Sequence, residues 1–312
     1  MQLRKNLTLY LSGIAVFTLT LLLLSTAFVL DESLGNRVAK IFWFYKVIIV
    51  VGIACIPLAW TRPFRFSVPD LLVLLYAGYT LCNDHYTGSI TPTRTGLFLL
   101  IIVTYFIFRR LTTFAPVCFT HAALLLSGTI EALWGLAQLY GFAPSQHSRF
   151  ELTGSFFNPG PYSGFLVAIL PLALHYTLTA CRTARILSGA VLVLLLLVLP
   201  ATLSRGAWLA ALAGCAIVLG NNFHLYSRLK ALFQKHKLTL SITTACMLLL
   251  TTGTLIGIYQ LKKESADGRW LIWKVSSTLV ASHPITGVGF GHFAGAYGDA
   301  QATYFAAKQR PA

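Results

Sequence analysis

The chain of 312 residues is 56% hydrophobic and only 11% charged, whereas a soluble domain carries about 25% charged residues. A soluble core cannot bury this much apolar surface, so the composition excludes an ordinary soluble domain and predicts an integral membrane protein. The formal net charge is +15, but the Lys and Arg residues form short clusters between apolar runs. This distribution favours topology signals and contacts with membrane lipids over a nucleic-acid partner.

Nine apolar segments approach the length of about twenty residues that crosses a bilayer as a helix. They lie roughly at residues 7–30, 41–60, 68–82, 95–108, 113–140, 162–181, 184–203, 205–221 and 238–258. The third and fourth are short and could be tilted, re-entrant or extended by a few residues. The first is too long for the core of a signal peptide and is expected to remain a transmembrane helix. The sequence therefore predicts an all-α, polytopic helical bundle of about nine transmembrane helices over residues 1–258.

The connections between these segments alternate in charge. The N-terminus and the even-numbered connections carry the uncompensated basic residues, namely Arg4, Lys5, Arg62, Arg65, Arg109, Arg110, Arg182, Arg185, Arg228, Lys230, Lys235 and Lys237. The odd-numbered connections are poorer in Lys and Arg or are balanced by acidic residues. The positive-inside rule then places the N-terminus in the cytoplasm and the odd-numbered connections outside.

The fifth connection and the segment after it read GSFFNPGPYSGFLVAILPLAL, residues 154–174. Pro161 suits the first turn of a helix, where its missing N–H is no loss, and Pro171 is expected to kink the helix. A polar, aromatic turn containing Asn158 and Tyr162 at the start of an apolar run fits two interpretations. It is either a structural entry turn or part of a site at the outer membrane surface.

Three polar residues stand in apolar surroundings. Arg205, in SRGAW, lies between two apolar runs with almost no loop around it, so it must snorkel to the interface, pair with another group or bind an anion. Glu131 lies inside the fifth segment, about 10–15 Å below the outer surface at 1.5 Å per residue, and Gln138 lies two turns further out. A buried carboxylate of this kind is usually paired, either structurally or within a functional site.

The last segment reads DGRWLIWKVSSTLVASHPITGVGFGHF, residues 267–293. Apolar residues recur at helical spacing between Arg269 and Ala281, at Leu271, Ile272, Val275 and Leu279. With Trp270 and Trp273 as aromatic anchors, this predicts an amphipathic helix at the membrane surface. The GVGFG stretch lacks a preceding strand and is not a dinucleotide loop. Residues 259–312 are expected to begin a large external loop.

Five polar residues from four segments are thus predicted on the outer side of the membrane: Glu131, Gln138, Asn158, Arg205 and Arg269. Two arginines at an interface suit a diphosphate on a lipid carrier. Aromatic side chains, including Tyr162 and Trp270, would line a groove for lipid or sugar. No CxxC, HxxxH or HExxH spacing occurs, so no metal site is expected.

Three stretches in this order, GSFFNPGPYSGFLVAILPLAL, SRGAWLA and GRWLIWKVSSTLVASHPITGVGFGHF, resemble the bacterial O-antigen ligase and polymerase family, from about Glu131 onward. The resemblance implies an inner-membrane glycosyltransferase with a periplasmic active site. Such enzymes transfer a glycan from an undecaprenyl-diphosphate carrier to lipid A–core or to another glycan, without cofactor, nucleotide sugar or metal. By motif, Arg205 and Arg269 correspond to the family arginines that hold the diphosphate, and Glu131, Gln138, Asn158, Tyr162 and Trp270 are assigned to substrate binding.

The resemblance also implies a catalytic histidine later in the large loop, which this sequence would reach only beyond Ala312. His283 occupies a structural turn of the family pattern and is not assigned as the base. Either the sequence is a fragment or a truncated form, or activity is absent. A repeat-unit polymerase, a lipid-linked glycan transporter or flippase, and a non-catalytic membrane protein remain as alternatives to the ligase.

Overall fold

The computed structural model describes residues 2–31, 33–61, 64–88, 91–225 and 263–309. Within these ranges the chain forms helices and no strand, apart from an isolated bridge between His147 and Phe150. The predicted all-α class is confirmed. The chain divides into two compact units, Met1–Phe64 with Val103–Leu229 and Arg65–Ile102 with Lys230–Ala312. The domain boundary predicted at residues 258 and 259 falls outside the described ranges.

Within the described ranges, 6 helical segments are long and apolar enough to cross a membrane, which confirms a polytopic membrane protein. They are Leu9–Phe28, Asn36–Pro57, Pro92–Phe114, Cys118–Leu139, Pro159–Thr179 and Arg182–Thr202. Each corresponds to one of the nine predicted segments. The predicted segments 68–82 and 205–221 are also helical but do not meet this criterion, and 238–258 lies outside the described residues.

The candidate spans expose much of their apolar surface. Only 22% to 39% of each is buried inside the protein. In α1 (Gln2–Leu24), Val16 and Thr20 are buried, whereas Leu11 and Ile14 are more than half exposed. Apolar surface facing water costs roughly 25 cal/mol per Å², so these faces are stable only against lipid. The exposed sides of the helices are therefore consistent with a bilayer around them.

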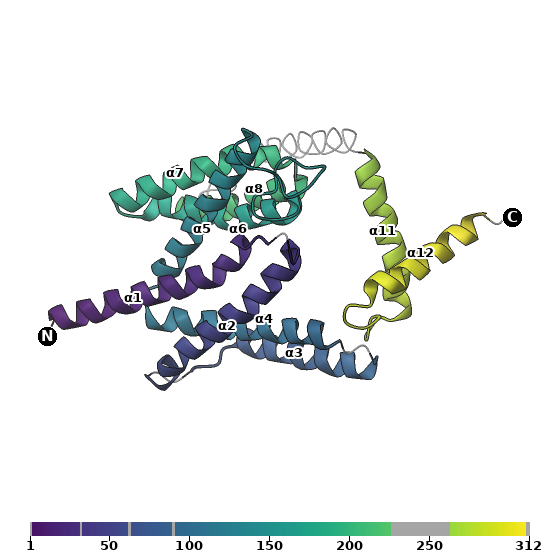
Figure 1. The fold of residues 1–312 in the computed structure, drawn as a ribbon, viewed down its shortest axis with the longest axis horizontal. Coiled ribbons are helices and arrows are strands. Elements are labelled where there is room, and N and C mark those ends of the chain that lie inside the picture. Colours follow the sequence, from purple (N-terminus) through teal and green to yellow (C-terminus); the bar gives the residue numbers. More distant parts are fainter. Residues whose placement is uncertain (1, 32, 62–63, 89–90, 226–262, 310–312) are drawn as a thin grey trace, which may run out of the picture. The chain divides into compact units, whose positions relative to one another are not determined.

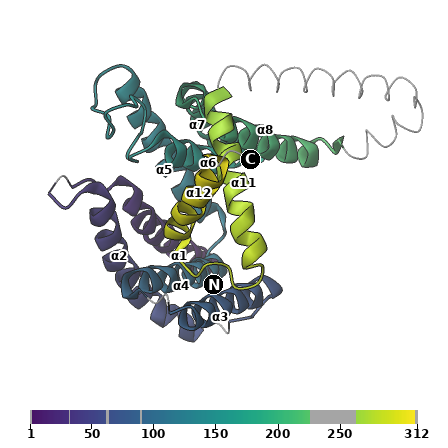
Figure 2. The ribbon, with the colours of Figure 1, turned by 90° about the vertical axis from the view of Figure 1, so that its right-hand side faces the viewer.

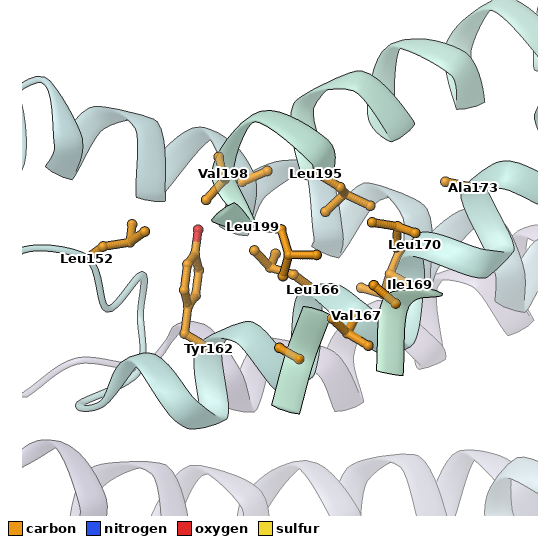
Figure 3. Close-up of a cluster of buried hydrophobic side chains, with 13 residues drawn as sticks. Leu152, Tyr162, Leu166, Val167, Ile169, Leu170, Ala173, Leu195, Val198 and Leu199 are labelled. Atoms are coloured by element: carbon orange, nitrogen blue, oxygen red, sulfur yellow. The ribbon is translucent and has the colours of Figure 1, made fainter. Parts of the chain in front are cut away.

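Four helices form the packed part of the first unit. They are α5 (Cys118–Leu139), α6 (Pro159–Thr179), α7 (Arg182–Val198) and α8 (Arg205–Asn222). Helix α6 contacts the other three, and its residues Tyr162, Leu166 and Leu170 are buried in the central apolar cluster. Figure 3 shows Tyr162 between Leu152 of the preceding loop and Leu199 after α7. The core therefore lies around α6.

Short connections determine which helix ends meet in this unit. Helix α6 ends at Thr179 and α7 begins at Arg182, so the two helices must run antiparallel. The chain then passes through the short 3₁₀ helix η2 (Pro200–Thr202), which contacts α6, and enters α8 at Arg205. The end of α5, the start of α6 and the start of α8 consequently lie at the same end of the unit.

The first two helices bring another connection to this end. Helix α1 is followed by η1 (Ser25–Phe28) and by α2 (Asn36–Thr61), and α1 and α2 form a hairpin (Figure 1). Helix α1 packs along α5. The turn of the hairpin is tied to the loop before α6, because Ser155 Oγ donates to the carbonyl of Ala27 at 2.7 Å.

The second unit contains α3 (Val68–Tyr86), the first part of α4 (Pro92–Phe114), α11 (Lys263–Ser282) and α12 (Phe293–Gln309). Helix α11 packs against α12, as Figures 1 and 2 both show. The predicted helix between Arg269 and Ala281 is present within α11. Val275 is buried and Leu271 and Leu279 are half-buried, whereas Trp270 and Trp273 are exposed, as aromatic anchors at a membrane surface would be. Ile272, which was predicted on the apolar face, is exposed instead.

The loop after α11 is docked on α3. The Tyr79 hydroxyl donates to the carbonyl of Ile285, and Asn83 Nδ2 donates to the carbonyl of Thr286 at 2.8 Å. Gly291 has φ +80°, and a Cβ built on it would lie 2.2 Å from Nη1 of Arg94. At Gly291 the backbone therefore packs closely against a neighbouring side chain, which a residue with a Cβ could not do without displacing it.

Candidate functional site

Glu131 lies on α5 and is fully buried. Its carboxylate accepts hydrogen bonds from the backbone N–H of Ser155 at 3.1 Å and from the Ser155 hydroxyl. Lys40, on α2, interacts electrostatically with the same carboxylate. The Lys40 ammonium also donates to the carbonyls of Ala27 and Ser155, at 2.5 and 2.7 Å. The carboxylate is thus paired within the protein, and it links α5, α2 and the loop before α6.

Gln138, two turns beyond Glu131, holds the same loop. Its Oε1 accepts from the backbone N–H groups of Thr153 and Gly154, at 2.9 and 2.7 Å. Its Nε2 donates to the carbonyls of Pro144 and Gly154, at 3.0 and 3.1 Å. Because buried backbone groups need partners, this one amide replaces the regular backbone pairing that a loop cannot supply.

Tyr162, in the first turn of α6, is fully buried, and its hydroxyl donates to the backbone carbonyl of Glu131 at 2.9 Å. Two glycines allow this approach. A Cβ on Gly135 would lie 1.9 Å from the hydroxyl oxygen, and a Cβ on Gly154 would lie 2.3 Å from the ring. Gly154 also has φ +56°, a conformation that a residue with a side chain rarely adopts.

Asn158 caps α6, since its Oδ1 accepts from the backbone N–H of Gly160 at 2.8 Å. This confirms that GSFFNPG is a helix entry turn. Asn158 and Phe157 are nevertheless exposed, so the turn also presents polar and aromatic side chains at the surface. Both interpretations of the motif are therefore compatible with its geometry.

Arg205 is the first residue of α8 and is half-buried. It follows a tight turn in which Leu203 has φ +50° and is 62% exposed. Trp208 secures the turn, because its Nε1 donates to the carbonyl of Leu199 at 3.2 Å. A left-handed conformation in a bulky residue is unusual and concentrates at functional sites.

Within the first unit, the structure brings Glu131, Gln138, Asn158, Tyr162 and Arg205 to one end of the bundle. Arg269 and Trp270 belong to the second unit, where both are exposed on α11. Their convergence with Arg205 stays a prediction. Among the described residues, no group of three or more His, Cys, Asp or Glu side chains could hold a metal ion.

The family comparison adds an independent observation. Residues 190–311 match the family model described as O-antigen ligase. These residues belong to the O-antigen ligase family. The matched segment contains both Arg205 and Arg269, and it confirms the family that the sequence motifs indicated. No curated protein and no solved structure matches the chain.

The O-antigen ligase match begins within α7, after the residues Glu131, Gln138, Asn158 and Tyr162. What these four residues do must therefore be argued from their contacts. Sequence reasoning missed Ser155 and Lys40, which join them in the same network. Lys40 lies at the start of an apolar run, but its partner Ser155 is 115 positions away, so no local pattern could reveal the pair.

The acidic residue of the α1–α2 connection is already occupied. The Ser33 hydroxyl donates to Asp31 Oδ1 at 2.6 Å, and the backbone N–H groups of Leu34 and Ser33 donate to the same atom. These hydrogen bonds hold the pKa of Asp31 below its ordinary value. At this end of the first unit, the carboxylates of Asp31 and Glu131 are thus engaged by donors of the chain itself.

Proposed function

We propose that this protein is a membrane glycosyltransferase of the O-antigen ligase type. It moves a glycan from an undecaprenyl-diphosphate carrier to an acceptor, lipid A–core or another glycan, at the periplasmic face of the bacterial inner membrane. The observation that carries the proposal is the family match over residues 190–311, which includes both Arg205 and Arg269. The 6 candidate spans supply the membrane environment in which a lipid-linked donor is found.

The arrangement of the first unit supports a one-sided active face. The positive-inside rule assigns the first, fifth and seventh connections to the periplasm. The same three connections meet at one end of the first unit, because α6 and α7 are antiparallel and the α1–α2 turn is tied to the loop before α6. Two independent arguments, from charge and from topology, therefore agree on which connections share a face.

In the proposed reaction, the acceptor hydroxyl attacks the anomeric carbon of the donor glycan. The new C–O bond forms as the bond to the carrier diphosphate breaks, and the electron pair leaves with the diphosphate. Arg205 and Arg269 would hold this group and stabilise its charge as it departs. A general base takes the proton of the acceptor hydroxyl; none is assigned among the described residues. From the family resemblance, we expect the reaction to invert the configuration of the anomeric carbon.

We assign two kinds of role to the remaining residues. Asn158 and Trp270 are exposed, and in this proposal they contact the substrate directly. Glu131, Gln138 and Tyr162 are buried, and the hydrogen bonds described above tie them to the chain itself. They contribute to binding by positioning the loop that carries Asn158, and they are positioning residues in this sense.

The test measures glycan transfer in membranes that contain the protein and a lipid-diphosphate donor. Arg205→Ala and Arg269→Ala should each reduce the transfer rate by about a hundredfold or more, the effect of removing one preorganised charge-stabilising group. Arg182→Ala is the matched control, because Arg182 is an exposed arginine that begins α7 at the opposite end of the unit. It should leave the rate unchanged.

Unchanged transfer in both active-site variants would remove the assignment of Arg205 and Arg269. Absence of transfer by the unaltered protein with either acceptor would contradict the glycosyltransferase itself. Supplying lipid A–core in one reaction and a second lipid-linked repeat unit in another distinguishes a ligase from a polymerase, since only the matching acceptor should be extended.

A further inference from the structure

A groove of about 840 Å³ lies between the start of α2 and the turn that leads into α6. Arg37 and Lys40 line it from α2, one helical turn apart. Phe156, Phe157 and Asn158 line it from the other side. All of these residues belong to the first unit. Asn36 also lines it, so the groove combines two cations, two amides and two aromatic rings in one space large enough for a phosphate and part of the group attached to it.

The side chains that line the groove carry only positive charge. Its lining contains two basic side chains and no acidic one. Arg37 is exposed, and no hydrogen bond or ion pair joins it to another described residue. The nearest acidic residue along the described chain, Asp31, accepts hydrogen bonds from Ser33 and Leu34 instead. An exposed guanidinium of this kind can grip a ligand anion with two parallel hydrogen bonds.

Of the two cations in the groove, Lys40 is the one that the protein holds in a defined position. Its ammonium donates to the carbonyls of Ala27 and Ser155 and lies 4.9 Å from the centre of the Phe156 ring. An ammonium has three hydrogens to donate, so one remains after these two bonds. Glu131 compensates part of its charge from the buried side. A cation held in place in this way loses little freedom when an anion binds beside it.

The position of the groove in the fold indicates the kind of anion. Helices α2 and α6 are both candidate membrane spans, and the groove lies where each begins. A ligand there meets the boundary between bilayer and water. Arg37 and Lys40 suit its phosphate, and Phe156 and Phe157 suit an apolar or sugar portion. This combination matches a phosphate carried on a lipid.

We propose that this groove is a phosphate subsite for the lipid diphosphate that serves as donor, with Arg37 and Lys40 as its cationic residues. An ordinary anionic phospholipid offers the same phosphate chemistry as the donor. The choice of the donor as the ligand therefore rests on the function proposed above. The assignment of the groove adds α2 to the elements that handle the donor, although α2 lies outside the segment that matches the family.

Binding can be measured without turnover. The purified full chain in lipid nanodiscs is titrated with a polyprenyl diphosphate, with the uncharged polyprenol and with phosphatidylglycerol, and bound lipid is quantified by native mass spectrometry. Arg37→Gln should weaken binding of the polyprenyl diphosphate by about tenfold, as expected for one charge-assisted contact. The polyprenol should bind the unaltered protein and the variant alike.

Arg182→Gln is the matched control, since it removes the same charge from the first turn of α7, outside the groove. It should bind the polyprenyl diphosphate as the unaltered protein does. Because Arg37 is exposed, Arg37→Gln should also keep the melting temperature of the protein.

Equal binding of the diphosphate by Arg37→Gln and the unaltered protein would overturn the subsite. If the protein bound phosphatidylglycerol as tightly as the polyprenyl diphosphate, and Arg37→Gln weakened both equally, the groove would be a general phospholipid site. That result would contradict the lipid diphosphate donor as its ligand. The transfer assay separates the two proposals. If Arg37→Gln keeps both binding and transfer while Arg205→Ala loses transfer, only the groove assignment fails. If the unaltered protein transfers no glycan but binds the diphosphate through Arg37, only the glycosyltransferase fails.

Discussion

Tyr162 illustrates how individual residues hold the loop before α6. The side chain is fully buried, and its hydroxyl reaches the backbone of α5 at the carbonyl of Glu131. This approach requires Gly135 on α5, because any Cβ at that position would overlap the hydroxyl. Sequence reasoning singled out Tyr162 as a groove-lining aromatic, whereas its contacts in the structure make it an anchor between two helices.

Replacing Gly135 with Ala should therefore destabilise the protein through Tyr162. The added Cβ would lie 1.9 Å from the hydroxyl oxygen but 2.9 Å from the ring carbon that carries it. We expect Gly135→Ala to cost about 1–3 kcal/mol, as overpacking of a well-packed core does. Tyr162→Phe should cost about 1 kcal/mol for the lost hydrogen bond. Thermal unfolding in detergent measures both.

The double variant Gly135→Ala/Tyr162→Phe should be less destabilised than the sum of the two single variants, because removing the hydroxyl removes the closest overlap. Tyr140→Phe is the control for loss of a tyrosine hydroxyl, since Tyr140 is 74% exposed. Strict additivity in the double variant would show that the hydroxyl is not what excludes a side chain at Gly135.

At the scale of elements, α6 is held by small residues on its neighbours. A Cβ on Gly214 of α8 would lie 2.6 Å from Cγ of Pro171, inside α6. Close approach at small residues is a common way for helices to pack where there is no hydrophobic driving force between them. The start and end of each helix, in contrast, follow local chemistry, as with the Asn158 cap and the prolines in the first turn of α6.

Gly214→Ala and Gly220→Ala form a matched pair on α8. The first places a methyl group against the Pro171 ring, which cannot rotate away, and should lower the melting temperature. The second meets nothing within 4 Å and should hold or raise the melting temperature, because Ala is favoured over Gly in a helix by roughly 1 kcal/mol. If the melting temperature rose in both variants, the contact between α6 and α8 would accommodate a methyl group beside Pro171, which would contradict this prediction.

At the scale of the whole molecule, the prediction concerns which connections share a membrane face. In a cysteine-free background, single cysteines at Ser33, Leu203 and Ser277 should be labelled by a membrane-impermeant maleimide from the periplasm. A cysteine at Arg182 should be labelled only after the membrane is opened. All four side chains are exposed in the structure. A difference in labelling therefore shows on which side of the membrane a residue lies, and not whether it is buried.

Ser277 lies on α11, the helix that carries Arg269, and Leu203 lies in the turn that leads into Arg205. Labelling of these two positions from opposite faces would end the proposal that Arg205 and Arg269 share a diphosphate. Labelling of Ser33 and Leu203 from opposite faces would contradict the topology of the first unit.

The sequence alone was sufficient for the membrane class, for most helix positions and for the family, because each depends on local information. Apolar runs, caps such as Asn158 and the order of short motifs are all contained within a few dozen residues. The helix between Arg269 and Ala281 was predicted from local spacing. Of its predicted apolar residues, Val275 is buried, Leu271 and Leu279 are half-buried and Ile272 is exposed.

Only the tertiary structure decided what the polar residues touch. Gln138 could have faced a substrate, a lipid or the protein, and its bonds to Thr153 and Gly154 follow from how the loop folds back on α5. The pairing of Lys40 with Ser155 spans 115 positions, and the groove beside them needs both segments in place. Hydrogen-bond partners and cavities depend on which surfaces are packed together, and packing between distant segments leaves no periodic trace in the chain.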